Sequence, residues 1–148
     1  MPGITVGVDG SHGAHQALEW AIKEAAAHNA PLTVLTVHEV AASGWTGNPI
    51  ILPPDLPAVE EARLAAEETV RKTLSQLGES QPPSVTVRAV NGIAAEELIN
   101  ASRDADLLVV GFRGTSGFAR VVLGSVSNKV VHHAHCPVVV VPEADSKV

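Results

Sequence analysis

Glycine and serine residues near the C-terminal end of the chain stand at a spacing that could hold a phosphate group. Two residues separate Gly111 from Gly114, and nine more lead to Gly124 and Ser125. Glycine lets the backbone approach an anion closely and adopt positive φ where needed. Gly124 and Ser125 stand where the last helix is predicted to begin, and a helix start offers unpaired N–H groups and the positive end of the dipole. The spacing therefore predicts a phosphate cradle from Gly111 to Ser125.

Charged and hydroxyl side chains within this stretch could complete the cradle. Arg113 or Arg120 would add positive charge, and the Ser125 hydroxyl could donate to a phosphate or reach a metal bound to it. Covalent catalysis is not indicated. Ser11 has no His or acid at motif spacing to activate it, so we interpret it as the N-cap of the first helix.

Short β-branched runs alternate with longer helical patterns along the chain. Helical spacing of apolar residues is found over residues 14–25, 59–77, 95–102 and 123–134. The predicted strands are Ile4 to Val8, Leu32 to Val40, Val85 to Val90, Leu107 to Val110 and Val138 to Val141. This alternation predicts an α/β fold, a three-layer doubly wound domain with a five-stranded parallel sheet of order 3-2-1-4-5. We expect one domain over residues 1–148, with a long loop, from Ala41 to Pro57, that is a lid or partly mobile.

The predicted topology selects a place for the ligand without reference to any motif. In a doubly wound sheet, ligands bind outside the carboxyl ends of the strands where strand order reverses. That crevice lies between the first and fourth strands, which are followed by Asp9 and by Gly111. Both positions are polar or glycine-rich, so we expect them to face each other across the crevice.

Composition narrows the class of protein. The formal net charge of −6 argues against a nucleic-acid footprint, which would need a basic face. The one cysteine, Cys136, cannot form an intrachain disulfide, and no apolar stretch nears the roughly 20 residues of a membrane span. The N-terminus lacks the pattern of a signal peptide. We expect a soluble, cytoplasmic protein without membrane partners.

The glycine pattern and its surroundings resemble the universal stress protein family, in its ATP-binding form. The similarity covers nearly the whole chain, because the first strand and turn, the fourth strand, and the last helix and strand each carry family-like sequences. These are residues 6–11 (VGVDGS), 105–111 (ADLLVVG), 123–127 (LGSVS) and 132–138 (HHAHCPV). The resemblance implies the adenine nucleotide α-hydrolase-like fold and an adenine nucleotide as ligand.

The resemblance also implies a role for individual residues. Asp9 would contact the ribose or the α-phosphate region, Val37 would hold the adenine through its backbone, and Gly111 would pack against the ribose. The remaining implied contacts are to phosphates, from Gly114, Gly124, Ser125 and Val126, with Ser127 close by. Phe112 departs from the small polar residue that family members often carry there.

The expected function is ATP binding by a regulator or sensor in the stress response, with Mg²⁺ (or Mn²⁺) accompanying the nucleotide and no catalytic residues. A slow ATPase and an adaptor without bound nucleotide remain alternatives, as do ADP or a cyclic adenine nucleotide as ligand. The last strand, Val138 to Val141, is expected at an unprotected sheet edge and predicts a homodimer.

Two further features were weighed as sites. A zinc site at His132, His133, His135 and Cys136 is disfavoured, because adjacent helical residues point to different faces. Trp45, in the long loop, could cover a ligand, or it could pack against a partner subunit or against the body of the protein.

Overall fold

A central parallel sheet organises the chain. The computed structural model describes residues 3–9, 12–39, 41–43, 49–51, 56–78, 81–111 and 125–142. Its five-stranded sheet has the order β5-β2-β1-β6-β7. The strands are β1 (Ile4–Val8), β2 (Leu32–Glu39), β5 (Val85–Gly92), β6 (Leu107–Gly111) and β7 (Val138–Val141). This order confirms the predicted 3-2-1-4-5 arrangement, and all the pairings within the sheet are parallel.

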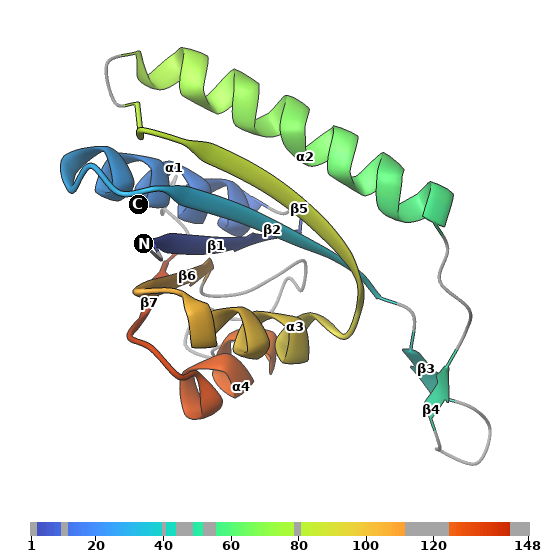
Figure 1. Ribbon diagram of the computed structural model, residues 1–148. Coiled ribbons are helices and arrows are strands. Elements are labelled where there is room, and N and C mark those ends of the chain that lie inside the picture. Colours follow the sequence, from blue (N-terminus) through green and yellow to red (C-terminus); the bar gives the residue numbers. More distant parts are fainter. Residues whose placement is uncertain are drawn as a thin grey trace, which may run out of the picture.

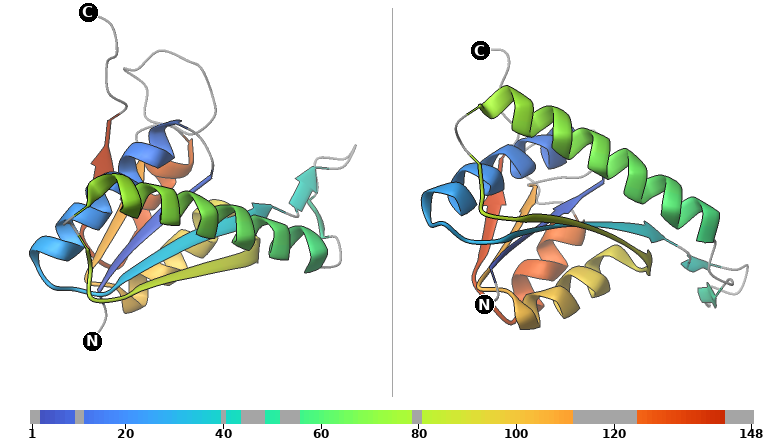
Figure 2. Two further views of the ribbon diagram at one scale, coloured as in Figure 1. Left: turned by 90° about the horizontal axis from the view of Figure 1, so that it is seen from above. Right: turned by 45° about the horizontal axis from the view of Figure 1, so that its top comes forward.

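Helices cover both faces of the sheet. One face carries α1 (His12–Ala27) and α2 (Leu56–Leu77). The other carries α3 (Ala94–Ala101), the 3₁₀ turn η1 (Ser102–Asp104) and α4 (Ser125–His133). Figure 1 shows these pairs of helices above and below the sheet, and the right-hand view of Figure 2 shows the same three layers. Helices on both faces are what right-handed crossovers between parallel strands produce.

The core is divided into two parts by the sheet. Successive strand residues point to opposite faces, so Val34 packs towards α1 while its neighbour Leu35 packs towards α3. The part under α1 and α2 includes Val6, Leu18, Ile22, Val34, Val70 and Val109. The part under α3 and α4 includes Leu35, Leu98, Leu108, Val110 and Val130. Apolar contacts on both faces explain why β6 and β7 read as continuous hydrophobic runs.

Helix α1 follows its sequence pattern closely. The positions predicted to line one helical face are all at most 5% exposed; they are Ala14, Ala17, Leu18, Ala21, Ile22 and Ala25. Four of these six are alanines, whose small side chains let the helix lie close to the sheet. On the opposite face of β1, Gly7 has a similar effect, since a Cβ there would come within 2.7 Å of Leu98 Cδ2. Glycine at this position therefore leaves room for the Leu98 side chain of α3 against β1.

The segment predicted as a loop from Ala41 to Pro57 is partly ordered secondary structure, so that prediction was wrong in part. Strands β3 (Ala41–Ser43) and β4 (Pro49–Ile51) form an antiparallel pair. Helix α2 begins at Leu56, before the predicted start at Val59. Pro57 is the second residue of α2, and proline is tolerated in a first helical turn because its missing N–H has no helical partner there. Trp45 lies outside the described residues.

None of the described helices is both long and apolar enough to cross a bilayer.

Candidate functional site

The carboxyl ends of β1 and β6 separate from each other. Their register runs only from Ile4↔Leu107 to Val6↔Val109. Each strand continues for two more residues, to Val8 and to Gly111. Strand order reverses at this point, because β2 lies on one side of β1 and β6 on the other. Doubly wound sheets bind ligands at this place, so the separated ends of β1 and β6 form the candidate crevice.

The backbone of Val37 faces this crevice. The Leu32 N–H donates to the Ser84 carbonyl at 2.9 Å, on the β5 side. The N–H and C=O groups of successive strand residues point alternately to the two sides. Those of Leu32 point towards β5, so the N–H and C=O groups of Val37 point towards β1. The β1–β2 register ends at Val8↔Thr36, so the Val37 carbonyl lies past the last residue of β1. Strand β2 itself continues to Glu39, so Val37 lies two residues before its end.

Gly111 also directs its backbone at the crevice. The Leu108 N–H donates to the Pro137 carbonyl at 3.0 Å, on the β7 side, so Gly111 faces the opposite way, towards β1. Its carbonyl accepts a hydrogen bond from Ser127 Oγ at 2.5 Å. Ser127 is 5% exposed. This bond brings the first turn of α4 to the carboxyl end of β6.

The other residues in the first turn of α4 are open to solvent. Ser125 is the first residue of the helix and is exposed, and the Val126 side chain is also exposed. N–H groups in a first helical turn have no partner within the helix. The start of α4 can therefore present donors and the positive end of its dipole to an anion in the crevice.

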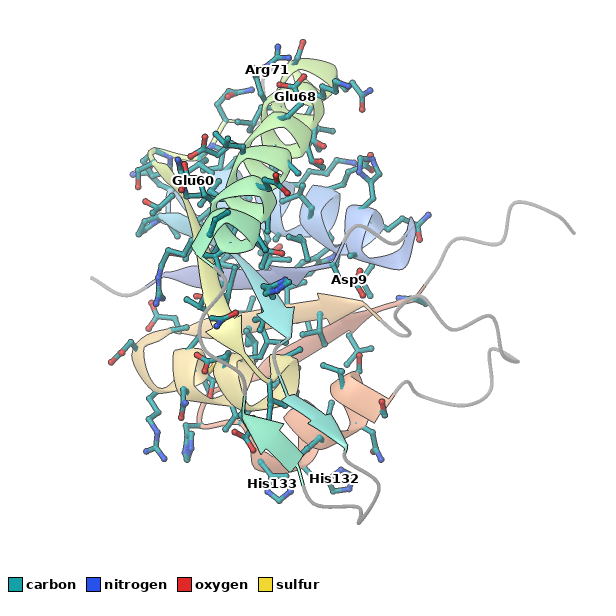
Figure 3. The ribbon with its side chains drawn as sticks, turned by 90° about the vertical axis from the view of Figure 1, so that its right-hand side faces the viewer. Asp9, Glu60, Glu68, Arg71, His132 and His133 are labelled. Atoms are coloured by element: carbon teal, nitrogen blue, oxygen red, sulfur yellow. The ribbon has the colours of Figure 1, made fainter. Side chains whose placement is uncertain are left out.

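Asp9 follows β1 directly and is exposed. Figure 3 shows it at the end of β1, on a different part of the molecule from His132 and His133 of α4. The predictions for Arg113, Gly114 and Gly124, and the departure at Phe112, fall outside the described residues. The structure thus brings Asp9, Val37 and Gly111 to the carboxyl ends of neighbouring strands, where α4 also begins.

A hollow lies on the α1 and α2 side of the sheet. Its volume is about 630 Å³, and Asp9, Ala62 and Thr69 are among its lining residues. The side chains at its floor, such as Leu18 and Val34, are at most 1% exposed. The hollow opens on the face of the sheet away from α4.

Metal-ligating side chains do not gather in the described part of the chain. No group of three or more His, Cys, Asp or Glu residues there could hold a metal ion. His132 Nδ1 lies 2.8 Å from the Asn128 carbonyl within its own helix. Burial raises the pKa of the Cys136 thiol, and the charge of Asp106 adds to that effect.

Comparison with known proteins gives the family. The model of the universal stress protein family matches residues 2–142. The chain belongs to the universal stress protein family. A universal stress protein of Mycolicibacterium smegmatis is 37% identical over 139 residues, which cover 94% of this chain and 47% of that relative. The chain thus spans about half the length of the curated relatives it matches.

Solved structures of family members share the fold. A universal stress protein from Lactobacillus plantarum is 28% identical, with a TM-score of 0.74 over 95% of this chain and 97% of that one. Another universal stress protein, solved in complex with cAMP, is 25% identical, with a TM-score of 0.67 over 97% of this chain and 98% of that one. The fold expected from the resemblance is thereby confirmed.

Proposed function

We propose that this universal stress protein binds ATP in the crevice between the carboxyl ends of β1 and β6 and acts as a nucleotide-dependent regulator in the stress response. The observation that carries the proposal is the early end of the β1–β6 register, with α4 beginning beside it. A relative of the same fold holds a cyclic adenine nucleotide. Together these observations support an adenine nucleotide as the ligand. The spacing of the glycines supports a ligand that carries phosphate groups.

Each end of the nucleotide has candidate partners. The Val37 carbonyl, past the end of β1, is an acceptor for an amino group of the base. The N–H groups of Ser125 and Val126 begin α4 and suit phosphate oxygens. Asp9 would contact the ribose or the α-phosphate region. The sequence pattern adds three further residues to the proposed cradle, namely Arg113, Gly114 and Gly124.

A divalent cation would accompany the phosphates. Mg²⁺ prefers oxygen ligands and is commonly bound through one or two protein groups plus substrate phosphates. The hydroxyl of Ser125, at the exposed start of α4, and the carboxylate of Asp9 have the chemistry that Mg²⁺ or Mn²⁺ accepts. The cation would shield the phosphate charge and so strengthen binding beside Asp9.

The protein is proposed to hold ATP without rapid turnover. Phosphoryl transfer needs a residue that positions the nucleophile and usually a second charged clamp. The described part of the crevice contributes backbone groups, the Ser125 hydroxyl and the Asp9 carboxylate. Hydrolysis faster than a few turnovers per hour, measured as phosphate release at saturating ATP, would identify an ATPase instead.

The binding site is tested by isothermal titration of ATP with Mg²⁺ against wild type and Gly114→Ala. We expect the variant to lose most of its affinity, because a Cβ would stand where backbone must approach the phosphates. Gly78→Ala is the matched control. Gly78 has a φ of +63° at the end of α2, so alanine there should destabilise the protein at a position away from the crevice. Equal affinity of wild type and Gly114→Ala would refute the assigned site.

A homodimer in the cytoplasm is proposed as the working form. Strand β7 is at one end of the described sheet, and Val138–Val141 are only partly buried in the single chain. Such an edge pairs readily with a second strand. Light scattering at micromolar concentration is expected to give twice the chain mass, and a monomer would contradict the proposal.

A further inference from the structure

The first turn of α4 contains two kinds of residue. Ser125 and Val126 are exposed, whereas Ser127 is 5% exposed and Val130, one turn later, is fully buried. Val130 packs in the core under α3 and α4. Residues three apart share a helical face, so Ser127 and Val130 form the inner face of α4 and Ser125 lies outside it.

The hydroxyl proton of Ser127 is already used. Ser127 Oγ donates to the Gly111 carbonyl at 2.5 Å. A serine hydroxyl carries a single proton, so this side chain has no proton left to donate to a phosphate oxygen. Its burial also keeps a bulky anion from reaching it. The family resemblance implied that Ser127 lies close to the phosphates, and the structure gives it a different partner.

This bond joins the two ends of the predicted phosphate-binding segment, so it affects the geometry of the site. Gly111 and Ser127 are 16 residues apart, and Gly114 and Gly124 lie between them in sequence. The Gly111 carbonyl faces β1, across the crevice, so the bond holds the first turn of α4 on that side of β6. The direction in which the N–H groups of Ser125 and Val126 point is set by where this turn lies.

We propose that Ser127 is a positioning residue: its hydrogen bond to the Gly111 carbonyl places the N-terminus of α4 at the crevice and so sets nucleotide affinity without contact with the nucleotide. This inference rests on the proposed function. It predicts that loss of the hydroxyl changes the ligand-free protein first and weakens binding as a consequence. A direct phosphate ligand would leave the ligand-free protein unchanged.

Another buried serine provides a matched control. Ser102 is 1% exposed, its Oγ donates to the Ile99 carbonyl at 2.5 Å, and it accepts from the His135 N–H at 2.9 Å. Ser102 precedes β6 in the chain, so it lies near the amino end of that strand, away from the crevice. Ser102→Ala removes the same kind of bond and should lower stability at least as much as Ser127→Ala.

The experiment compares wild type with Ser127→Ala, Ser127→Thr, Ser127→Cys and Ser102→Ala. The carbonyl carbon shift of Gly111 is measured by NMR without nucleotide, the affinity for ATP with Mg²⁺ by titration calorimetry, and Tm by circular dichroism. We expect Ser127→Ala to move the Gly111 carbonyl shift and to weaken ATP binding about fivefold, the scale of one neutral hydrogen bond. Ser127→Thr should restore both, and Ser102→Ala should lower Tm alone. Ser127→Cys keeps nearly the size of serine and should weaken binding even if Ser127→Ala fails to fold.

The outcomes separate this inference from the proposed function. Wild-type affinity in both Ser127→Ala and Ser127→Cys, or an unmoved Gly111 carbonyl shift in the ligand-free variants, would overturn the positioning role while leaving ATP binding in place. Weaker binding in Ser102→Ala of the same size would also overturn it, because the effect would then follow stability. A wild-type protein that binds no ATP would refute the proposed function itself.

Discussion

Helices α2 and α4 each bury a hydroxyl group that donates to a backbone carbonyl, but the two acceptors differ in origin. Thr73 Oγ1 donates to the Thr69 carbonyl at 2.8 Å, within α2 itself. Ser127 Oγ donates to the Gly111 carbonyl at 2.5 Å, on β6. The first bond satisfies a buried polar atom locally. The second ties the start of a helix to the end of a strand.

The two helices also differ in length and in what holds them in place. Helix α2 has 22 residues and exposed ion pairs along its length, of which Arg63 with Glu60 and Glu67 and Arg71 with Glu68 are examples. Figure 3 shows Arg71 beside Glu68 on this helix. Helix α4 has 9 residues, fewer than an isolated helix needs to be stable in water. Its order and position must come from tertiary contacts. The hydrogen bond from Ser127 to the Gly111 carbonyl is one such contact, and it lies at the start of α4.

The largest expected effect tests packing under each helix. Val130 of α4 and Val70 of α2 are 0% and 5% exposed. We expect Val130→Ala and Val70→Ala each to lower the free energy of unfolding by about 2 kcal/mol, because each removes two buried carbons and leaves a cavity. Urea denaturation measures the loss. ATP titration should show weaker binding for Val130→Ala alone, since only α4 begins at the crevice.

Equal ATP affinity in the two valine variants would contradict the proposed difference between α2 and α4. It would mean that the start of α4 keeps its place when its inner face is loosened, and that packing of α4 has no part in binding.

A smaller effect is expected at the local hydroxyl of α2. Thr73→Val keeps the shape of the side chain and removes only the donor. The Thr69 carbonyl retains its ordinary helical partner, so we expect the free energy of unfolding to change by less than about 1 kcal/mol. Urea denaturation and ATP titration should place this variant close to wild type. A fivefold loss of ATP affinity here would show that local and long-range hydroxyl bonds are equivalent.

The smallest effect concerns the exposed ion pairs of α2. The hydrogen bond from Arg63 lowers the pKa of Glu60, although burial opposes it slightly. A lowered carboxyl pKa stabilises the fold above the ordinary pKa of glutamate, and this contribution disappears as the pH falls through the lowered value. We expect Arg63→Met to lower Tm slightly at pH 7 and not at about pH 2. Arg103→Met, at an exposed arginine of η1, is the control.

High salt should shrink the Tm difference between wild type and Arg63→Met, because ions screen exposed charge pairs. A difference that persists at acidic pH would show that Arg63 acts through the packing of its side chain.

Much of the fold was predictable, because it depends on periodic patterns. The apolar face of α1 and the continuous runs of β6 and β7 identified these elements and their order in the chain. The strand pair β3–β4 was missed, because three-residue strands show too little alternation to stand out from a loop. Pro57 also misled the prediction, since it marked the end of a loop while α2 had already begun at Leu56.

The candidate site was predictable only in part. Asp9 and Gly111 follow strands whose carboxyl ends had to meet at the reversal of strand order, so their proximity followed from topology. The partner of Ser127 did not follow, because nothing in the spacing of Gly111 and Ser127 distinguishes a phosphate ligand from a backbone anchor. Periodicity reports which face of an element is buried, and it carries no information on which distant polar group a buried hydroxyl meets.

By itself, the amino-acid sequence determined the family, the alternation of strands and helices, and the glycine spacing on which the phosphate cradle rests. Only the tertiary structure decided where β1 and β6 separate and which backbone groups face the crevice. It also decided that Ser127 turns inward while Ser125 stays exposed. The physical reason is that local propensities act over a few neighbouring residues, whereas strand separation and long-range hydrogen bonds depend on how the layers pack together.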